Sequence, residues 1–345
     1  MADYFDIFGF KVQYLSSDPS DLTKGQVWYN STTNISKVRG FSAASFTTSA
    51  SQNRPTDPSD NSGSNSVFDD AVKAGGRGTG APSTNSGVNW TESWDGTSWT
   101  NESNRPWAAW GGGAGGPPSY FLNAGGYKSP SQPSGTPGAS VIWSGYWNPS
   151  GWTALPNLSL PSGKNFFGMC GTATAAITTA GYVYGGPFTG AVSNVEEWDG
   201  SSWTAGTAFP AAIYNGYTTF GSSVPTTHFA GGYGPSPATL TQHFTYDGSS
   251  WTLLPAAVPN FLGAATGAPD NALGVYQPGA SLLWDGSTWS SNPVTGAYSP
   301  PGGLGRSGTG SKAIVWIDNW NHPSDSGKTF IWEAAEVATQ TITTS

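Results

Sequence analysis

The segment Trp94-Asp95-Gly96-Thr97-Ser98-Trp99-Thr100 occurs five times, with small changes, in the chain of 345 residues. Four copies keep the Asp-Gly pair, whereas the copy at 147–153 has Asn148-Pro149 there and its Gly at 151. Because Gly adopts the positive φ of a tight turn, Asp-Gly between two aromatic segments predicts a hairpin. Each copy should therefore join two antiparallel strands. The structural repeat consists of ten aromatics: Trp94, Trp99, Trp147, Trp152, Trp198, Trp203, Tyr246, Trp251, Trp284 and Trp289.

The spacing of the copies predicts the architecture. Their second aromatics, at positions 99, 152, 203, 251 and 289, are separated by 38 to 53 residues, which brackets the roughly 50-residue period of a four-stranded propeller blade. Gly-Gly doublets at 125–126, 185–186 and 231–232 each close a small apolar segment that we interpret as an inner strand. We predict an all-β propeller over residues 41–345 with six four-stranded blades. Five or seven blades are the alternatives.

The two ends of this region repeat less clearly. Residues 49–87 are dense in Ser, Asn, Pro and Gly, which is typical of long loops decorating the first blade. The last blade lacks the Asp-Gly hairpin. Two of its strands are expected at 313–320 and 328–333, and residues 336–344 alternate and are rich in Thr and Val. We expect this last segment to form the outermost strand of the final blade.

These residues carry a resemblance to a known family. A Gly-Gly doublet followed by an aromatic and by a second Trp about five residues later resembles the kelch motif, over residues 41–345. More narrowly, residues 171–204 resemble the kelch-like repeats of virion proteins from marine tailed bacteriophages. The segment Gly25-Gln26-Val27-Trp28-Tyr29-Asn30-Ser31-Thr32-Thr33-Asn34 is similar to one that recurs in cyanophage structural proteins. The resemblance implies a virion structural protein of the tail, a tail fibre or another appendage.

Residues 1–40 lie outside the repeat period and are interpreted as an N-terminal docking arm. Val27 to Tyr29 and Ile35 to Val38 predict a small hairpin within it. An apolar cluster that a short segment cannot bury by itself usually marks a partner site. The candidate docking residues are Tyr4, Phe5, Phe8, Phe10, Trp28 and Tyr29. The alternative is that the arm folds back on the propeller as a cap.

Composition disfavours several classes of function. The chain has 13 basic and 21 acidic residues, whereas a nucleic-acid groove needs clustered Lys and Arg. Its single cysteine, Cys170, excludes an internal disulfide framework and a Cys-x-x-Cys metal or redox pair. No apolar run approaches 18 residues, and the first residues do not resemble a signal peptide, so no membrane insertion is expected.

The sequence also offers no catalytic constellation. His228, His243 and His322 lack the spacing of metal ligands, so no metal or other cofactor is expected. Glu196 and Glu197 are adjacent in an expected strand, where successive side chains point to opposite faces, so they cannot face each other across a glycoside. No Gly-x-Ser-x-Gly nucleophile elbow occurs. We therefore expect a protein that is not an enzyme.

Tryptophans outside the repeat are the candidate binding residues. Trp107, Trp110, Trp316 and Trp320 lie near expected strand ends or loops, where an indole ring can stack on a sugar or dock against a protein. Together with the resemblance, this favours a non-enzymatic virion protein that adheres to a glycan or protein of the host surface. It would be assembled in the host cytoplasm, as an oligomer with other virion proteins. The alternative is a decoration or assembly protein whose propeller is a rigid spacer.

Overall fold

The regular secondary structure of the described residues is almost entirely β-strand. The computed structural model describes residues 12–20, 26–41, 44–49, 62–63, 68–78, 86–128, 138–185, 189–213, 218–232, 240–258, 262–276, 280–292, 304–317, 329–334 and 337–341. Its two helical turns, η1 (Pro118–Tyr120) and η2 (Val224–Thr226), are single 3-10 turns, and no described helix is long enough to cross a membrane. The chain divides into two units, Met1–Ser45 with Glu333–Ser345, and Phe46–Trp332.

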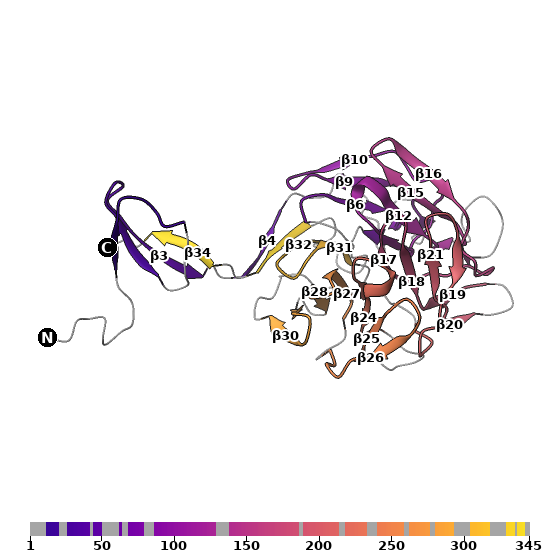
Figure 1. Ribbon diagram of the computed structural model, residues 1–345. Coiled ribbons are helices and arrows are strands. Elements are labelled where there is room, and N and C mark those ends of the chain that lie inside the picture. Colours follow the sequence, from indigo (N-terminus) through magenta and orange to yellow (C-terminus); the bar gives the residue numbers. More distant parts are fainter. Residues whose placement is uncertain are drawn as a thin grey trace. The chain divides into compact units, whose positions relative to one another are not determined.

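The larger unit contains, among its described residues, six four-stranded sheets (Figure 1). We number them as blades in chain order. Blades 1 to 3 are β5 (Ser62–Gly63), β6 (Ala71–Ala74), β9 (Thr91–Trp94) and β10 (Trp99–Asn101); β11 (Gly113–Gly115), β12 (Phe121–Ala124), β15 (Ser144–Asn148) and β16 (Gly151–Leu155); and β17 (Gly168–Gly171), β18 (Ala176–Thr179), β21 (Glu196–Trp198) and β22 (Trp203–Ala205). Blades 4 to 6 are β23 (Thr219–Phe220), β24 (Thr227–Ala230), β25 (His243–Tyr246) and β26 (Trp251–Leu253); β27 (Ala264–Ala268), β28 (Asn271–Tyr276), β29 (Ala280–Trp284) and β30 (Trp289–Asn292); and β31 (Leu304–Gly308), β32 (Lys312–Ile317), β33 (Thr329–Glu333) and β4 (Ser45–Thr48).

The first strands of the blades close a ring. Each contacts the first strand of the next blade, in the order β5, β11, β17, β23, β27 and β31, and β31 contacts β5. These strands are rich in Gly and Ala because neighbouring backbones approach closely there: a Cβ on Gly115 would lie 3.1 Å from Cα of Cys170. The all-β propeller of four-stranded blades is confirmed, with six blades.

Every copy of the repeat forms the turn between the third and fourth strands of a blade. In blade 1, Trp94 pairs with Trp99, and Gly96 has φ of 93°. Oδ1 of Asp95 accepts hydrogen bonds from the backbone N–H groups of Thr97 and Ser98, at 2.8 and 2.7 Å. These bonds lower the pKa of Asp95 to about 2. The predicted hairpins are therefore confirmed, and the Asp side chain accepts the hydrogen bonds of the backbone N–H groups in the turn.

The second tryptophan of each copy also connects neighbouring blades. The indole N–H of Trp152 donates to Oγ1 of Thr91 in blade 1, at 2.9 Å, and that of Trp203 donates to Oγ of Ser144 in blade 2, at 3.0 Å. Trp99 donates in the same way to Oγ1 of Thr329 in blade 6, at 2.8 Å. The three acceptors occupy the same place, the first residue of the third strand of the preceding blade. The repeat thus specifies both the hairpin and the contact between blades.

Blade 6 is completed by a strand from the opposite end of the described chain. Its outermost strand is β4, and the backbone N–H of Ser49 donates to the carbonyl of Thr329 at 2.8 Å. The ring of Phe46 on β4 lies 4.9 Å from that of Trp332 on β33. The expectation that residues 336–344 form this strand is therefore wrong, because an earlier segment already occupies the edge of the blade.

The smaller unit is a four-stranded sheet built from both ends of the chain. Its order is β1 (Gln13–Leu15), β2 (Val27–Asn30), β3 (Ile35–Phe41) and β34 (Val337–Thr341), with β1 parallel to β2 and the other pairs antiparallel. The predicted hairpin is confirmed as β2 and β3. The boundary differs from the expected division at residue 40, since β34 belongs to this sheet and not to the propeller.

Candidate binding surface

Three additional hairpins extend blades 1 to 3 between their second and third strands. They are the two-stranded sheets of β7 (Arg77–Gly78) with β8 (Ser86–Gly87), β13 (Tyr127–Lys128) with β14 (Ala139–Ser140), and β19 (Gly181–Val183) with β20 (Gly190–Val192). β8 contacts β13, and β14 contacts β19. The extensions of three successive blades therefore form one contiguous surface.

Backbone hydrogen bonds join these extensions to the connections between blades. Trp110, in the connection from blade 1 to blade 2, exchanges two bonds with Tyr127 at 3.2 and 2.7 Å. Asn165, in the next connection, exchanges two bonds with Tyr182 at 2.9 and 2.8 Å. Between the hairpins, the N–H of Ser140 donates to the carbonyl of Tyr184 at 2.9 Å. The surface is therefore fixed by bonds between segments that are distant in sequence.

Five aromatic side chains lie together on this surface, and we call them the aromatic platform: Trp110, Tyr127, Phe166, Tyr182 and Tyr184. The ring centroid of Trp110 lies 5.1 Å from that of Tyr127 and 5.2 Å from that of Phe166. The ring of Tyr184 lies 5.0 Å from Tyr127 and 4.7 Å from Tyr182. All five are partly exposed, and Tyr184 has 39% of its surface in solvent. Packed but accessible rings of this kind offer apolar faces with polar edges.

The Gly-Gly doublet of blade 2 positions the connection that carries Phe166. The N–H of Gly126 donates to the carbonyl of Lys164 at 2.9 Å, and a Cβ on Gly125 would lie 2.6 Å from the same oxygen. Gly125 and Gly126 both have positive φ, of 62° and 112°. Phe166 itself has φ of 52°, a left-handed conformation that costs about 1 to 3 kcal/mol in a residue with a side chain. The surrounding bonds therefore hold this ring in place against local strain.

A buried arginine fixes the connection that carries Trp110. Nε of Arg105 donates to the carbonyl of Trp107 at 2.9 Å, and Nη2 donates to the carbonyl of Ala109 at 2.7 Å. Nη1 donates to Oδ1 of Asn123. Burial lowers the pKa of Arg105 to about 9, so the guanidinium remains charged at neutral pH. Its bonds to the residues directly before Trp110 hold that ring in position.

A buried lysine plays the corresponding part in the next connection. Nζ of Lys164 lies 3.4 Å from the carboxylate of Glu196 and donates to the carbonyl of Asn194 at 3.0 Å. Burial lowers the pKa of Lys164 to about 8, an effect that Glu196 opposes. Oε1 of Glu196 accepts bonds from Oγ of Ser159 and from the N–H of Leu160, both at 2.9 Å. The carboxylate of Glu196 thus serves to hold the connection between blades 2 and 3 in place.

The candidate tryptophans occupy different environments. Trp110 belongs to the platform, but Trp107 is only 7% exposed and packs against Trp143 and Trp152, with ring centroids 6.5 and 5.8 Å away. The expectation that Trp107 lies on a binding surface is therefore corrected: its ring is buried against Gly145 and Trp152 of blade 2. Trp316 lies on β32, and only its backbone is described. Trp320 lies outside the described residues.

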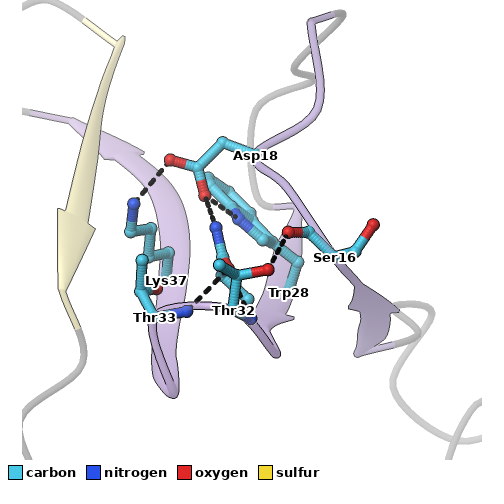
Figure 2. Close-up of polar contacts among 7 residues, drawn as sticks. Ser16, Asp18, Trp28, Thr32, Thr33 and Lys37 are labelled. Atoms are coloured by element: carbon cyan, nitrogen blue, oxygen red, sulfur yellow. Dashed lines mark hydrogen bonds and ion pairs between the residues drawn. The ribbon is translucent and has the colours of Figure 1, made fainter.

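In the smaller unit, Trp28 is buried and serves the fold. Oδ1 of Asp18 accepts a bond from Nε1 of Trp28 at 3.0 Å, as Figure 2 shows. The same oxygen accepts from Nδ2 of Asn30 at 2.8 Å. Oδ2 of Asp18 accepts from Nζ of Lys37 at 2.5 Å, which is the main reason that the pKa of Asp18 falls to about 2. Trp28 is fully buried and Tyr29 is half-buried. Tyr4, Phe5, Phe8 and Phe10 lie outside the described residues.

Sequence reasoning missed two arrangements. Four platform residues were not singled out, although Tyr127 directly follows a Gly-Gly doublet, and Tyr182 and Tyr184 shortly precede one. His228 and His243 lack the spacing of metal ligands in the sequence, but Nδ1 of His228 lies 2.9 Å from Nε2 of His243. Their adjacent strands, β24 and β25, bring them together. Among the described residues, no three His, Cys, Asp or Glu side chains are grouped as metal ligands would be.

Comparison with known proteins supports the fold. No protein-family model matches the chain, and no curated protein matches it in sequence. Among solved structures, the chain is similar to YjhT, a kelch-repeat β-propeller protein, with a TM-score of 0.59 and 12% sequence identity. The similarity covers 86% of this chain and 99% of that one. The chain therefore has the fold of a kelch propeller.

Proposed function

We propose that the protein is a non-enzymatic adhesin, in which the propeller presents the aromatic platform to a glycan or protein of a host cell surface. The observation that carries the proposal is the platform itself: five partly exposed rings held by the extensions and connections of blades 1 to 3. A surface that is already ordered loses little conformational entropy on binding. Aromatic anchors also contribute much of the affinity in many interfaces.

The chemistry of nearby groups favours binding over catalysis. The platform supplies rings and phenolic hydroxyls, and the two buried cations near it, Arg105 and Lys164, are engaged in fixing the connections. Tyr127 does not act as a base at neutral pH, because desolvation and the neighbouring Tyr184 raise its pKa further above the ordinary value. Glu196 is held by Lys164, Ser159 and Leu160. These roles favour a site that binds a ligand and releases it without chemical change.

The virion part of the proposal rests on sequence resemblance. Residues 25–34 are similar to a segment of cyanophage structural proteins, and residues 171–204 resemble repeats of phage virion proteins. In this proposal the smaller unit attaches the protein to other virion proteins at the tail or another appendage. The propeller then faces the host.

The test of adhesion compares cell binding by the parent protein and a platform variant. Fluorescently labelled protein is titrated onto intact cells of a panel of marine bacteria, and bound protein is measured by flow cytometry. The double variant Trp110→Ala with Tyr184→Ala should bind at least about tenfold more weakly, because it removes two ring faces. Trp107 is left intact, since its removal would disturb the core.

The matched control is Tyr14→Ala in the smaller unit, since Tyr14 is 76% exposed and lies outside the platform. This variant should bind cells as the parent does. Near-UV circular dichroism and thermal melting establish that both variants remain folded. Unchanged binding by the folded platform variant would contradict the proposal and would favour the rigid-spacer alternative.

A further inference from the structure

The acidic residues of this chain are unevenly distributed. From position 103 to position 195 there is no Asp or Glu, although the whole chain contains 21 of them. The same 93 residues contain three cations, Arg105, Lys128 and Lys164. The other 252 residues hold ten basic against 21 acidic residues. One segment of an acidic protein thus has a net positive charge.

This acid-free segment forms the binding surface. It contains all of blade 2, from β11 to β16, and the β19–β20 extension of blade 3. All five residues of the aromatic platform lie within it: Trp110, Tyr127, Phe166, Tyr182 and Tyr184. An anion approaching the platform therefore meets no carboxylate from these elements, whereas the other 252 residues together carry a net negative charge.

Lys128 is the cation of this segment that reaches solvent. It adjoins Tyr127 in β13 and is partly exposed, and its Nζ lies 5.8 Å from the ring centroid of Trp143. Arg105 and Lys164, by contrast, are buried. Trp143 is itself 37% exposed, so its indole continues the aromatic surface beside Lys128. An ammonium next to stacked rings is a suitable partner for a ligand with both an apolar face and an acid group.

Within the described part of the chain, a buried donor without a partner lies in the connection that carries Phe166. Nδ2 of Asn165 is buried and has no hydrogen-bond partner among the described residues, although Oδ1 of the same side chain lies 3.3 Å from Oγ of Ser140. Asn165 directly precedes Phe166 and pairs with Tyr182, both in the platform. This Nδ2 group is a hydrogen-bond donor, and a carboxylate or sulfate oxygen is a hydrogen-bond acceptor.

We propose that the aromatic platform binds an acidic glycan, with sugar faces stacked on the rings and carboxylate or sulfate groups beside Lys128. This inference rests on the proposed adhesin function and specifies its ligand. Pyranose rings supply the apolar faces that fit Tyr127 and Tyr184, and ionised substituents supply the charge that fits the acid-free surface. A neutral glycan would use the rings alone.

The experiment compares matched acidic and neutral polymers at pH 7. Carboxymethyl-dextran is paired with dextran, and polygalacturonate with its methyl-esterified form, by affinity electrophoresis of the full chain. The acidic member of at least one pair should bind about tenfold more tightly than its neutral partner, because a charge-assisted contact is added. Raising the ionic strength from 50 to 500 mM should remove most of this preference, since contacts near the surface are screened.

Three variants identify the source of the preference. Lys128→Gln should abolish it and Tyr184→Ala should weaken binding of both polymers, whereas Lys312→Gln should change neither. Lys312 is the matched control because its Nζ also lies near an aromatic ring, 3.9 Å from the centroid of Phe68, in another blade. Failure to bind either acidic polymer, or an acidic preference that survives Lys128→Gln, would overturn the inference. Equal binding of neutral and acidic polymers that depends on Tyr184 would overturn it while leaving the adhesin function intact.

Discussion

A histidine pair lies between blades 4 and 5. The indole N–H of Trp289 donates to Nδ1 of His243 at 3.0 Å, so this nitrogen carries no proton. Nε2 of neutral His243 therefore carries the proton and donates to Nδ1 of His228. The tryptophan thus fixes both tautomers, because an indole nitrogen is always a donor. His243 occupies the place that Thr91 and Ser144 hold in blades 1 and 2, as the acceptor for the tryptophan of the next blade.

This pair predicts a loss of stability in mild acid. Burial lowers the pKa of His228 to about 4 and that of His243 to about 3, from an ordinary value of 6.5. The unfolded chain therefore binds protons before the folded one does, and stability that is complete above pH 6.5 is lost as the pH falls towards 4. Between these limits each histidine should reduce the unfolding free energy by about 1.4 kcal/mol per pH unit. Urea unfolding at pH 7.5, 6.0 and 5.0 measures this slope.

The variant His228→Gln isolates the contribution of one histidine. It removes one titrating group and keeps a side chain that can accept from His243, so the slope should fall by about half. A slope between pH 7.5 and 5.0 that is the same in parent and variant would contradict the assigned protonation states.

A second residue-scale prediction concerns the tryptophans between blades. Trp203 is 5% exposed, packs with Leu158 and Phe167, and donates to Ser144 in the preceding blade. Trp203→Ala should therefore reduce the unfolding free energy by about 3 to 5 kcal/mol, as expected for a large aromatic removed from a core. Trp251→Ala is the comparison, because its half-buried ring should cost less. Urea titration at pH 7.5 measures both, and a loss below about 1 kcal/mol for Trp203→Ala would mean that the contact between blades is unimportant.

At the scale of elements, the Gly-Gly doublet is where the second strand of a blade meets the connection from its neighbour. In blade 2, Gly126 donates to the carbonyl of Lys164; in blade 1, Gly76 donates to the carbonyl of Ala109 at 3.1 Å. In blade 2, a Cβ on Gly125 would lie 2.6 Å from the carbonyl oxygen of Lys164, and one on Gly126 would lie 3.0 Å from that of Trp110. The doublet therefore determines where each connection lies, and with it the position of Trp110 and Phe166.

Gly125→Ala tests this role. The new Cβ would lie 2.6 Å from the carbonyl oxygen of Lys164, at a positive φ, so the unfolding free energy should fall by about 2 to 5 kcal/mol. Gly248→Ala is the matched control, since Gly248 also has positive φ but its nearest neighbour would be Cβ of Pro225 at 3.9 Å. It should cost only the conformational term, about 1 to 2 kcal/mol. Equal losses in urea titrations would show that the contact with Lys164 contributes nothing.

How much of the fold was predictable depends on how far apart the interacting residues are in sequence. The Asp-Gly hairpins join strands that are only a few residues apart, so the pairing of Trp94 with Trp99 is predictable from the local sequence. The platform could not be read in this way, since Trp110 meets Tyr127 and Phe166 only after two blades and their connections have assembled. The sequence makes Trp110 a candidate because it lies near expected strand ends, but nothing in the local sequence distinguishes it from the buried Trp107.

At the scale of the whole molecule, blade 6 contains a sixth copy of the aromatic repeat that cannot be found as one continuous stretch of sequence. Trp332 is fully buried, and its indole N–H donates to the carbonyl of Gly310 at 2.8 Å. Trp198 and Trp284 donate similarly to Ala173 and Pro269 in their own blades. Trp332 is therefore the first aromatic of a sixth copy. Its partner is Phe46, on the strand that closes the ring, so the two halves of this copy come from opposite ends of the propeller sequence.

This closure makes a prediction about truncation. A chain of residues 44–334 keeps β4 and should retain the propeller, with an unfolding free energy close to that of this unit in the full protein. A chain of residues 50–334 lacks β4 and the contact between Phe46 and Trp332, and should be less stable by at least about 3 to 5 kcal/mol. Near-UV circular dichroism and urea unfolding measure the difference. Equal stability of the two chains would mean that β4 does not close the ring.

The chain of residues 44–334 also tests the docking role of the smaller unit. A deletion that ended at residue 38 would be a poorer test. That shorter deletion removes β1, β2 and most of β3, so β34 loses most of its partner strand, and any loss of function could reflect the exposed strand rather than a missing docking surface. The chain of residues 44–334 removes β1, β2, β3 and β34 together. If the smaller unit attaches the protein to a virion, this chain should bind acidic glycan as the parent does but fail to enter particles in a complementation assay. Normal entry into particles would contradict the docking role.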